Sequence, residues 1–224
     1  MHEHHLTISR TARYYTLGEP GPAVHELWIA CHGYGQLAAE FLARMTAVQS
    51  PTRLVVAPEG LSRFYLERAR GGSHSSSAIG ASWMTREDRN AEIGDQVAYL
   101  DVLAQVFIPP VSPSAVKLTV LGFSQGVATA CRWLVHSRAR AHRLVCWGGL
   151  VPDDVLRGDV GALRHTKICL VAGSRDEFVG ADRVATAAAA LQALGLDVTS
   201  ITFHGGHRLD DATLGQLVAS DHLS

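Results

Sequence analysis

A strand that runs directly into a helix through a glycine-flanked serine constrains the fold of this chain more than any other feature. Residues 117–135 read KLTVLGFSQGVATACRWLV, in which a strand-like apolar run is followed by apolar residues at helical spacing. Ser124 lies at the join, with Gly122 and Gly126 two positions to either side. A sharp turn there would leave no room for side chains at those two positions and would expose the serine hydroxyl. The alternative is an ordinary glycine-rich turn whose serine has no role.

Short apolar strands alternate with helical segments along the rest of the chain. Strands are expected at 7–17 (irregular), 26–31, 53–60, 117–121, 143–149 and 167–172, with a last one from about residue 197. Helices are expected over 36–48, 86–107, from 125, over 182–194 and from about 210. The long helix at 86–107 is expected to bury one face made of Ile93, Val97, Leu100 and Ala104. This order predicts a single α/β domain over residues 1–224, a mostly parallel sheet with helices on both faces.

Composition excludes several classes of protein. With 47% hydrophobic residues in 224 the chain can build a sizeable core, and its net charge of -1 gives no general attraction to nucleic acid. The chain contains no run of about 18 apolar residues, so no membrane span is predicted. Its first ten residues do not resemble a secretory signal. The four cysteines form no CxxC pair, which favours buried free thiols in a cytoplasmic protein. No metal site is expected, and we interpret the terminal histidines as solvent-facing: His2, His4 and His5.

Polar residues follow the later strands at positions where they could activate Ser124. A serine nucleophile needs a base, and the base needs an acid that orients it. Asp176 comes just past the strand at 167–172, and His207 comes just past the last strand. Their neighbours Glu177 and His204 are alternatives. We favour Asp176 because a shorter carboxylate suits the turn, and His207 because two glycines precede it and would let its loop reach over the sheet.

The first buried strand ends in CHGYGQ, residues 31–36. Its glycines would let the backbone curl closely, so that the amide of Tyr34 points at the same oxygen as the amide of Gln125. Two such amides are what an oxyanion hole requires. We interpret His32 as a hydrogen-bond partner that shapes this loop rather than as a second base.

With these residues in view, the chain resembles the phospholipase/carboxylesterase branch of the α/β-hydrolases, the branch that includes acyl-protein thioesterases. The segments that carry the resemblance span nearly the whole chain in the family's order: CHGYG, ASWM, GFSQG, AGSRDEFV and GGH. The resemblance implies a nucleophile at Ser124 and catalytic partners at Asp176 and His207. It also implies oxyanion donors at Tyr34 and Gln125, an aromatic residue near the substrate cleft at Trp83, and hydrolysis of small to medium carboxylic esters without a cofactor.

The chain departs from the family pattern at three places. Val127 stands where the elbow often continues with another glycine, and Met84 and Thr85 replace a common aspartate. Residues 58–77 are unlike the corresponding stretch of the thioesterases, so protein depalmitoylation is not carried over. We therefore expect a serine carboxylesterase acting on a small-molecule ester through an acyl-enzyme. A thioesterase, a peptidase-like hydrolase and a non-catalytic binding protein on the same scaffold are the alternatives.

Substrate choice is expected to depend on residues 61–81, which show no sustained helical or strand period. This segment follows a core strand and so begins at the catalytic edge of the sheet. Phe64 and Tyr65 are predicted to form one wall of the acyl or alcohol pocket, and Trp83 the far side. Residues 71–77 have the composition of a mobile loop. The alternative is a surface insertion that contacts no substrate.

Overall fold

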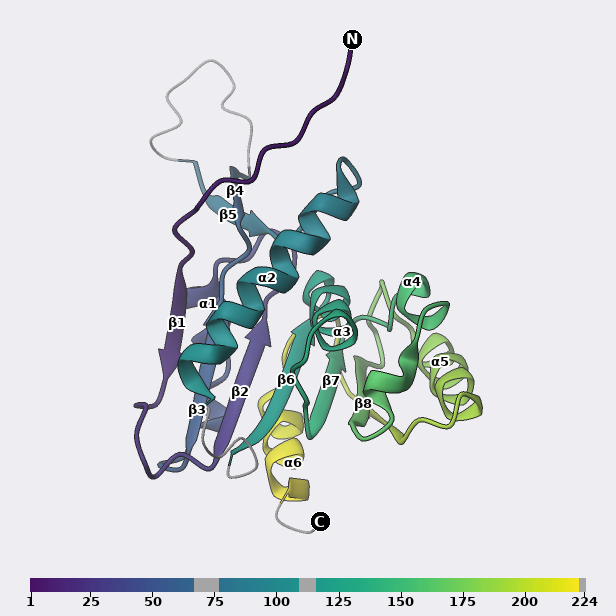
Figure 1. Cartoon of the computed structure of the whole chain (residues 1–224). Coiled ribbons are helices and arrows are strands. Elements are labelled where there is room, and N and C mark those ends of the chain that lie inside the picture. The colour runs from purple at the N-terminus through teal and green to yellow at the C-terminus, as the bar shows by residue number, and fades with distance from the viewer. Residues whose placement is uncertain (67–76, 109–115, 222–224) are drawn as a thin grey trace.

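The computed structural model of the chain describes residues 1–66, 77–108 and 116–221. Seven of the described strands form one sheet in the order β1-β3-β2-β6-β7-β8-β9 (Figure 1). The strands are β1 Tyr14–Leu17, β2 Glu26–Cys31, β3 Arg53–Pro58, β6 Lys117–Phe123, β7 Arg143–Trp147, β8 Lys167–Gly173 and β9 Val198–Phe203. β1 pairs antiparallel with β3, and every other neighbour pairs parallel. This confirms the predicted mostly parallel sheet.

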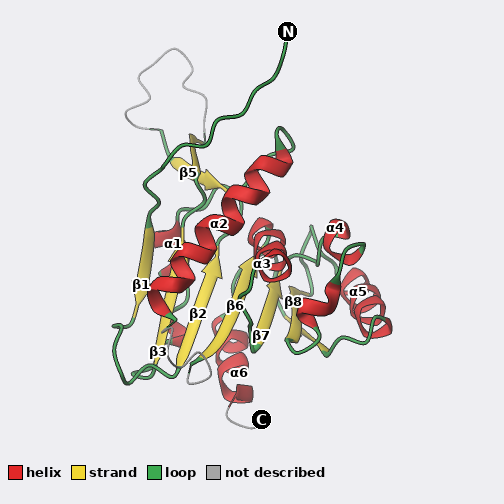
Figure 2. Cartoon of the chain, in the orientation of Figure 1, coloured by secondary structure: helices red, strands yellow, loops and turns green. Residues whose placement is uncertain are grey.

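Helices cover both faces of the sheet, as predicted (Figure 2). They are α1 Ala38–Leu42, α2 Arg89–Phe107, α3 Gln125–His136, α4 Asp153–Leu156, α5 Ala181–Ala193 and α6 Asp211–Asp221, with 3-10 turns η1 Thr46–Val48 and η4 Val160–Leu163. Successive residues of β2 point to opposite faces of the sheet. Leu27 and Ile29 belong to the buried cluster that includes residues of α2, α3 and α5, while Trp28 and Ala30 belong to the cluster that includes residues of α1 and α6. Because both faces are buried, the strands are apolar throughout rather than alternating.

The first expected strand and the first expected helix are much shorter than the sequence predicted. Only Tyr14–Leu17 of the first expected strand pairs with β3, and residues 1–11 are exposed. The helix expected over 36–48 is divided into α1 and η1 because hydrogen bonds tighten to the i to i−3 type at Arg44 and Met45. This tightening lets Met45 and Val48 both reach the core.

The buried face of α2 differs from the predicted one. The helix buries Gln96, Leu100, Leu103 and Ala104, whereas Ile93 and Val97 are only partly buried. Gln96 takes a core position because its side chain joins a buried hydrogen-bond chain between Trp83 and Thr129. An apolar pattern cannot reveal a polar residue that is buried for its hydrogen bonds.

The sequence predicted an irregular segment over 61–81, but its described residues, 61–66 and 77–81, are not irregular. They contain a second, two-stranded sheet in which β4 Ser62–Tyr65 pairs antiparallel with β5 Ile79–Ser82. Four-residue strands are too short to give a clear period, and Gly80 and Ser82 have weak strand propensity. The proposed mobile loop at 71–77 lies, except for Ser77, outside the described residues.

Two expectations from composition, on the cysteines and on membrane spans, can be compared with the structure. All four cysteines are buried and free, as predicted. In the part of the chain that the structure describes, no helix is both long and apolar enough to cross a bilayer.

Candidate active site

Ser124 occupies a strained backbone conformation between β6 and α3. Its φ of 53° and ψ of -116° lie in a region that non-glycine residues rarely adopt. Strain of this kind costs about 1–3 kcal/mol and persists only where surrounding structure enforces it. Here the Ser124 amide donates to Trp147 O at 2.8 Å, and Ser124 O accepts from the Val127 amide at 3.1 Å. The turn is therefore held by its own backbone hydrogen bonds.

The two glycines around Ser124 are required by close backbone packing. A Cβ added to Gly122 would lie 2.4 Å from Gly126 O, and a Cβ added to Gly126 would lie 2.2 Å from Cys31 O. At Gly122 the start of α3 lies too close to the end of β6 to leave room for a Cβ. At Gly126 the backbone of α3 lies equally close to the end of β2. The spacing that the sequence analysis singled out is thus explained by packing on both sides of the turn.

We predict that Gly126→Ala destabilises the fold by about 1–3 kcal/mol, because the carbonyl of Cys31 would have to move. Gly215→Ala is the matched control, since nothing lies within 4 Å of a Cβ added there in α6. Alanine is the better helix former, so the control should be neutral or slightly stabilising. Urea unfolding of both variants measures the difference, and equal midpoints would contradict the packing argument.

Asp176 and His207 are joined by a hydrogen bond. Asp176 follows β8, and His207 lies in the loop after β9; the His207 Nδ1 to Asp176 Oδ2 distance is 2.8 Å. The other carboxylate oxygen, Oδ1, accepts from the amides of Phe178 at 2.9 Å and Val179 at 3.0 Å. Because a carboxylate only accepts, Nδ1 carries the proton and Nε2 of the neutral ring is left as an acceptor. The Asp176 side chain is 2% exposed, so the pair is fixed in place.

The two alternative partners of Ser124 face solvent. Glu177 and His204 are both exposed, whereas Asp176 is buried and the His207 side chain is 16% exposed. The centroids of the His207 and Phe123 rings lie 4.9 Å apart, and a Cβ added to Gly148 would lie 2.9 Å from His207 Cε1. Close packing therefore sets the orientation of His207, and the described residues show no comparable contact at His204.

The loop after β2 passes directly beside Ser124. A Cβ added to Gly33 would lie 3.2 Å from Ser124 Cβ, so the loop backbone lies against the side chain of Ser124. The imidazole of His32 is buried, with Nδ1 2.7 Å from Gly33 O and Nε2 accepting from the Gly60 amide at 2.9 Å. His32 thus links this loop to the end of β3, in keeping with the loop-shaping role expected from the sequence.

His32 gives the fold a predicted pH dependence. Burial lowers the pKa of His32 below its ordinary value, and hydrogen bonding to Gly33 opposes this only in part. The unfolded chain therefore binds a proton more readily than the folded one, so stability should fall as the pH drops below about 6.5. Protonation of Nε2 would also break the hydrogen bond from Gly60. We expect the loss of unfolding free energy between about pH 7.5 and 5.5 to be smaller in His32→Asn, measured by urea unfolding. An equal loss of unfolding free energy in His32→Asn and in the wild type over this pH range would contradict this prediction.

A cleft of about 870 Å³ opens over Ser124 and His207. Its lining combines aromatic and apolar residues with charged ones: Gly33, Tyr34, Phe41, Phe123, Phe178 and Leu209 with Glu40, Arg44, Arg208, Asp210 and Asp211. Asp176 lies behind His207 and not in the lining. The cleft is large enough for a ligand of drug-like size.

The three residues that the sequence suggested for substrate binding lie outside this lining. The ring of Phe64 is stacked against that of Tyr34, with centroids 5.1 Å apart, and Tyr65 is 49% exposed on β4. Trp83 is 2% exposed, and its Nε1 donates to His32 O at 2.8 Å. Phe64 therefore adjoins the cleft through Tyr34, while Trp83 belongs to the core under the loop.

Two residues that support the site were missed in the sequence. The side chain of Gln125, considered there only for its amide, hydrogen-bonds to the chain after β5. Glu59, at the end of β3, has a fully buried carboxylate that accepts from Arg13, Arg63 and the Ala38 amide. Burial opposes its ionisation, but these hydrogen bonds outweigh burial and lower the pKa of Glu59. A lone acid after an apolar strand, in the run VVAPEG, is the signal that could have revealed it.

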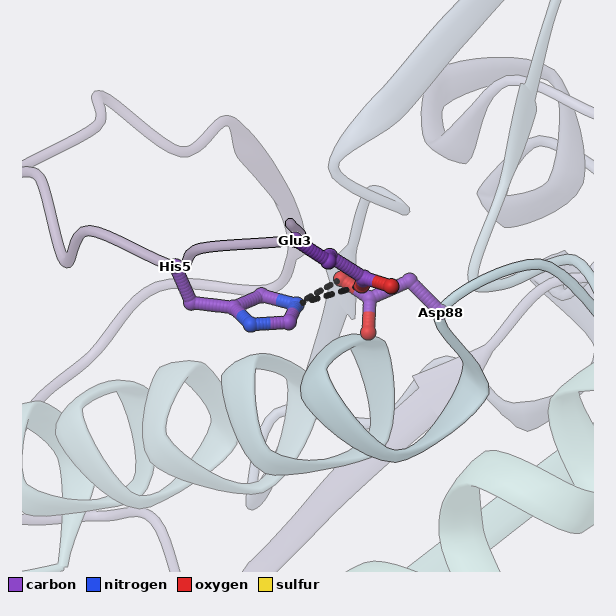
Figure 3. Close-up of side chains that lie close together, drawn as sticks. All are labelled: Glu3, His5 and Asp88. Atoms are coloured by element: carbon purple, nitrogen blue, oxygen red, sulfur yellow. Dashed lines mark hydrogen bonds and ion pairs between the residues drawn. The ribbon is translucent and has the colours of Figure 1, made fainter. Parts of the chain in front are cut away.

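A group of possible metal ligands joins the N-terminal segment to the start of α2, and none of its members lines the cleft. Glu3, His5 and Asp88 bring their ligand atoms within 4.8 Å of one another, and all three residues are exposed (Figure 3). His5 Nε2 lies 3.3 Å from Glu3 Oε1 and 3.1 Å from Asp88 Oδ2. The three groups thus form an exposed cluster of polar side chains, and the terminal histidines are exposed as expected.

The fold and the strained strand-to-helix serine define the class: the chain has the α/β-hydrolase fold. It belongs to the phospholipase/carboxylesterase family, whose model matches residues 14–223. Esterase PE8 is similar in structure, with 20% identity, a TM-score of 0.69, and coverage of 96% of this chain and 99% of that one.

Two further solved structures are similar. Zea mays acyl-protein thioesterase 2 has 18% identity and a TM-score of 0.66, covering 93% of this chain and 99% of its own. The Bacillus cereus carboxylesterase has 16% identity and a TM-score of 0.68, and the match covers 95% of this chain and 94% of that one. No protein of curated function matches the chain in sequence. The family is thus one of esterases and thioesterases.

Proposed function

We propose that the protein is a serine carboxylesterase that hydrolyses small to medium-chain carboxylic esters through an acyl-enzyme. The observation that carries the proposal is the hydrogen bond of 2.8 Å between His207 and Asp176 beside a cleft that is also lined by Ser124. A serine, an imidazole and a buried carboxylate at three strand ends form the arrangement that activates a hydroxyl group. Membership of a family of esterases and thioesterases supports the same reaction class.

In the proposed reaction, Ser124 Oγ attacks the ester carbonyl carbon while His207 Nε2 takes the hydroxyl proton. The carbonyl oxygen becomes an oxyanion, which accepts from the backbone amides of Tyr34 and Gln125. The carbon–oxygen bond to the alcohol then breaks, and His207 returns the proton to the departing alcohol. Water repeats the sequence on the acyl-enzyme and releases the acid. Asp176 holds the tautomer and stabilises the imidazolium throughout.

The cleft supports a substrate of modest length with both apolar and polar parts. Phe123 and Phe178 flank His207, and the ring of Phe178 meets the imidazole edge-on with centroids 4.7 Å apart, so an apolar acyl group would be buried beside the reacting atoms. Glu40, Arg44 and Asp211 line the same cleft and can hydrogen-bond to a polar alcohol portion. An aromatic wall discriminates between chain lengths by only about 1–3 kcal/mol per methylene.

Matched substrates test the proposal. We expect p-nitrophenyl butyrate to be turned over, and an oxygen ester to give a higher kcat/KM than the thioester or amide of the same acyl group. A higher kcat/KM for the thioester would contradict the carboxylesterase assignment and favour a thioesterase. No turnover of any of the three would favour a binding protein on the same scaffold.

A further inference from the structure

A short segment that begins within β5 and continues just past it contacts the loop that carries the first proposed oxyanion donor. We call residues 80–84 the strap. The Gly35 amide donates to Ala81 O at 2.9 Å, and the Ala81 amide donates to Gln36 O at 3.3 Å. Gly80 packs directly on the loop, because a Cβ added there would lie 2.5 Å from Gly35 O and 2.8 Å from Gly35 Cα. The loop after β2 is thus paired to the strap as if to another strand.

The same strap contacts the second proposed donor from its other end. The side chain of Gln125 accepts from the Trp83 amide at 3.1 Å through Oε1. It donates through Nε2 to Met84 O at 2.8 Å and to Ser82 Oγ at 3.2 Å. These hydrogen bonds fix the residue whose backbone amide follows Ser124. The two proposed donors are far apart in the sequence, and the strap bridges them.

Buried polar contacts anchor the strap to the core. Trp83 Nε1 donates to His32 O at 2.8 Å, and Gln96 Nε2 donates to Trp83 O at 2.7 Å. Thr129 Oγ1 in α3 donates to Gln96 Oε1 at 3.0 Å. Trp83 and Gln96 are 2% and 3% exposed. A satisfied buried network of this kind is rigid, and breaking one member leaves the others unpaired.

We propose that the strap sets the position of the two oxyanion amides, with Gly80 and the Gln125 side chain as positioning groups for the reaction. The inference rests on the proposed function, since it assigns a task to that same site. Donors must lie 2.7–3.1 Å from the place where the negative charge develops, so a shift of a few tenths of an ångström weakens them. Such a shift weakens transition-state binding and leaves binding of the neutral ester nearly unchanged.

Gly80→Ala tests the strap, with Gly94→Ala as the matched control because nothing lies within 4 Å of a Cβ added at Gly94 in α2. Two quantities are measured besides KM: kcat on p-nitrophenyl butyrate, and the Ki of an alkyl trifluoromethyl ketone, whose adduct with Ser124 carries an oxyanion. For Gly80→Ala we expect kcat to fall about 10- to 100-fold, less than the roughly 10²–10³-fold cost of losing a donor outright. Ki should rise by a similar factor while KM stays within about twofold. The control should match the wild type.

Gln125→Met provides a second variant should Gly80→Ala fail to fold. It removes the side-chain hydrogen bonds to the strap while keeping the volume and the backbone amide, and we expect the same paired change in kcat and Ki. A folded variant with wild-type kcat and Ki, or one in which only KM changes, would contradict the proposed role of the strap. The esterase assignment would be unaffected by that result. A wild-type protein that neither turns over esters nor binds the ketone would overturn the proposed function, and the strap with it.

Discussion

Ser124→Ala is expected to lower kcat for ester hydrolysis by about six orders of magnitude, leaving only the residual rate that substrate binding and the proposed oxyanion amides supply. The hydroxyl is the proposed nucleophile, and no neighbouring side chain can replace it in forming the acyl-enzyme. The hydrogen bonds by which Ser124 holds its turn come from its backbone, so the fold should persist. Steady-state kinetics on p-nitrophenyl butyrate, with thermal unfolding to show that the variant is folded, measure the effect.

The members of the proposed triad should act as a unit, so a second substitution gives a sharper form of this prediction. Adding His207→Ala to Ser124→Ala should cost little more, because an imidazole without a nucleophile has no proton to take. A folded Ser124→Ala protein that keeps more than a few per cent of wild-type turnover would show that the nucleophile is another residue.

His207→Ala and Asp176→Asn should each lower kcat by about two to four orders of magnitude. The first removes the base. The second replaces the acceptor of the Nδ1 proton with an amide, which can favour the wrong tautomer of the ring. The carboxylate also accepts from the amides of Phe178 and Val179, so asparagine keeps an oxygen for that turn and should preserve the fold. Kinetics on a common ester substrate give both values.

Neighbouring residues serve as matched controls for these two substitutions. His204→Ala and Glu177→Gln change the same residue types one to three positions away in the chain, on exposed side chains. Their kcat should stay within a few fold of the wild type, as expected for surface positions. If His204→Ala lowered kcat more than His207→Ala, the proposed base would be His204. If Glu177→Gln lowered kcat more than Asp176→Asn, the proposed acid would be Glu177.

The sequence predicted those parts of the molecule that rest on local backbone chemistry. Gly122 and Gly126 flank Ser124 because neither position has room for a Cβ, and this requirement is visible in a single stretch of sequence. The contact between Asp176 and His207 was predictable from the order of strand ends, because parallel strands bring their carboxyl ends to one edge of the sheet. The catalytic roles of these residues stay predictions.

Interactions between segments far apart in the chain were not predictable in the same way. The aromatic side chain of Trp83 suggested a wall of the substrate pocket, yet its indole is buried and donates to His32 O. Gln96 was overlooked because an apolar periodicity takes no account of a buried amide. Each of these placements depends on a partner supplied by another element, and no local pattern names that partner. The strands β4 and β5 were missed for a local reason, because four residues are too few to give a clear period.

Labelling with a fluorophosphonate tests the central claim most directly, because the probe reacts only with a serine that is activated as a nucleophile. The intact mass of the wild-type protein should increase by one adduct per chain, and peptide mapping should place that adduct on Ser124. Ser124→Ala should remain unmodified under the same conditions. An unmodified wild-type protein, or an adduct on another serine, would contradict the account.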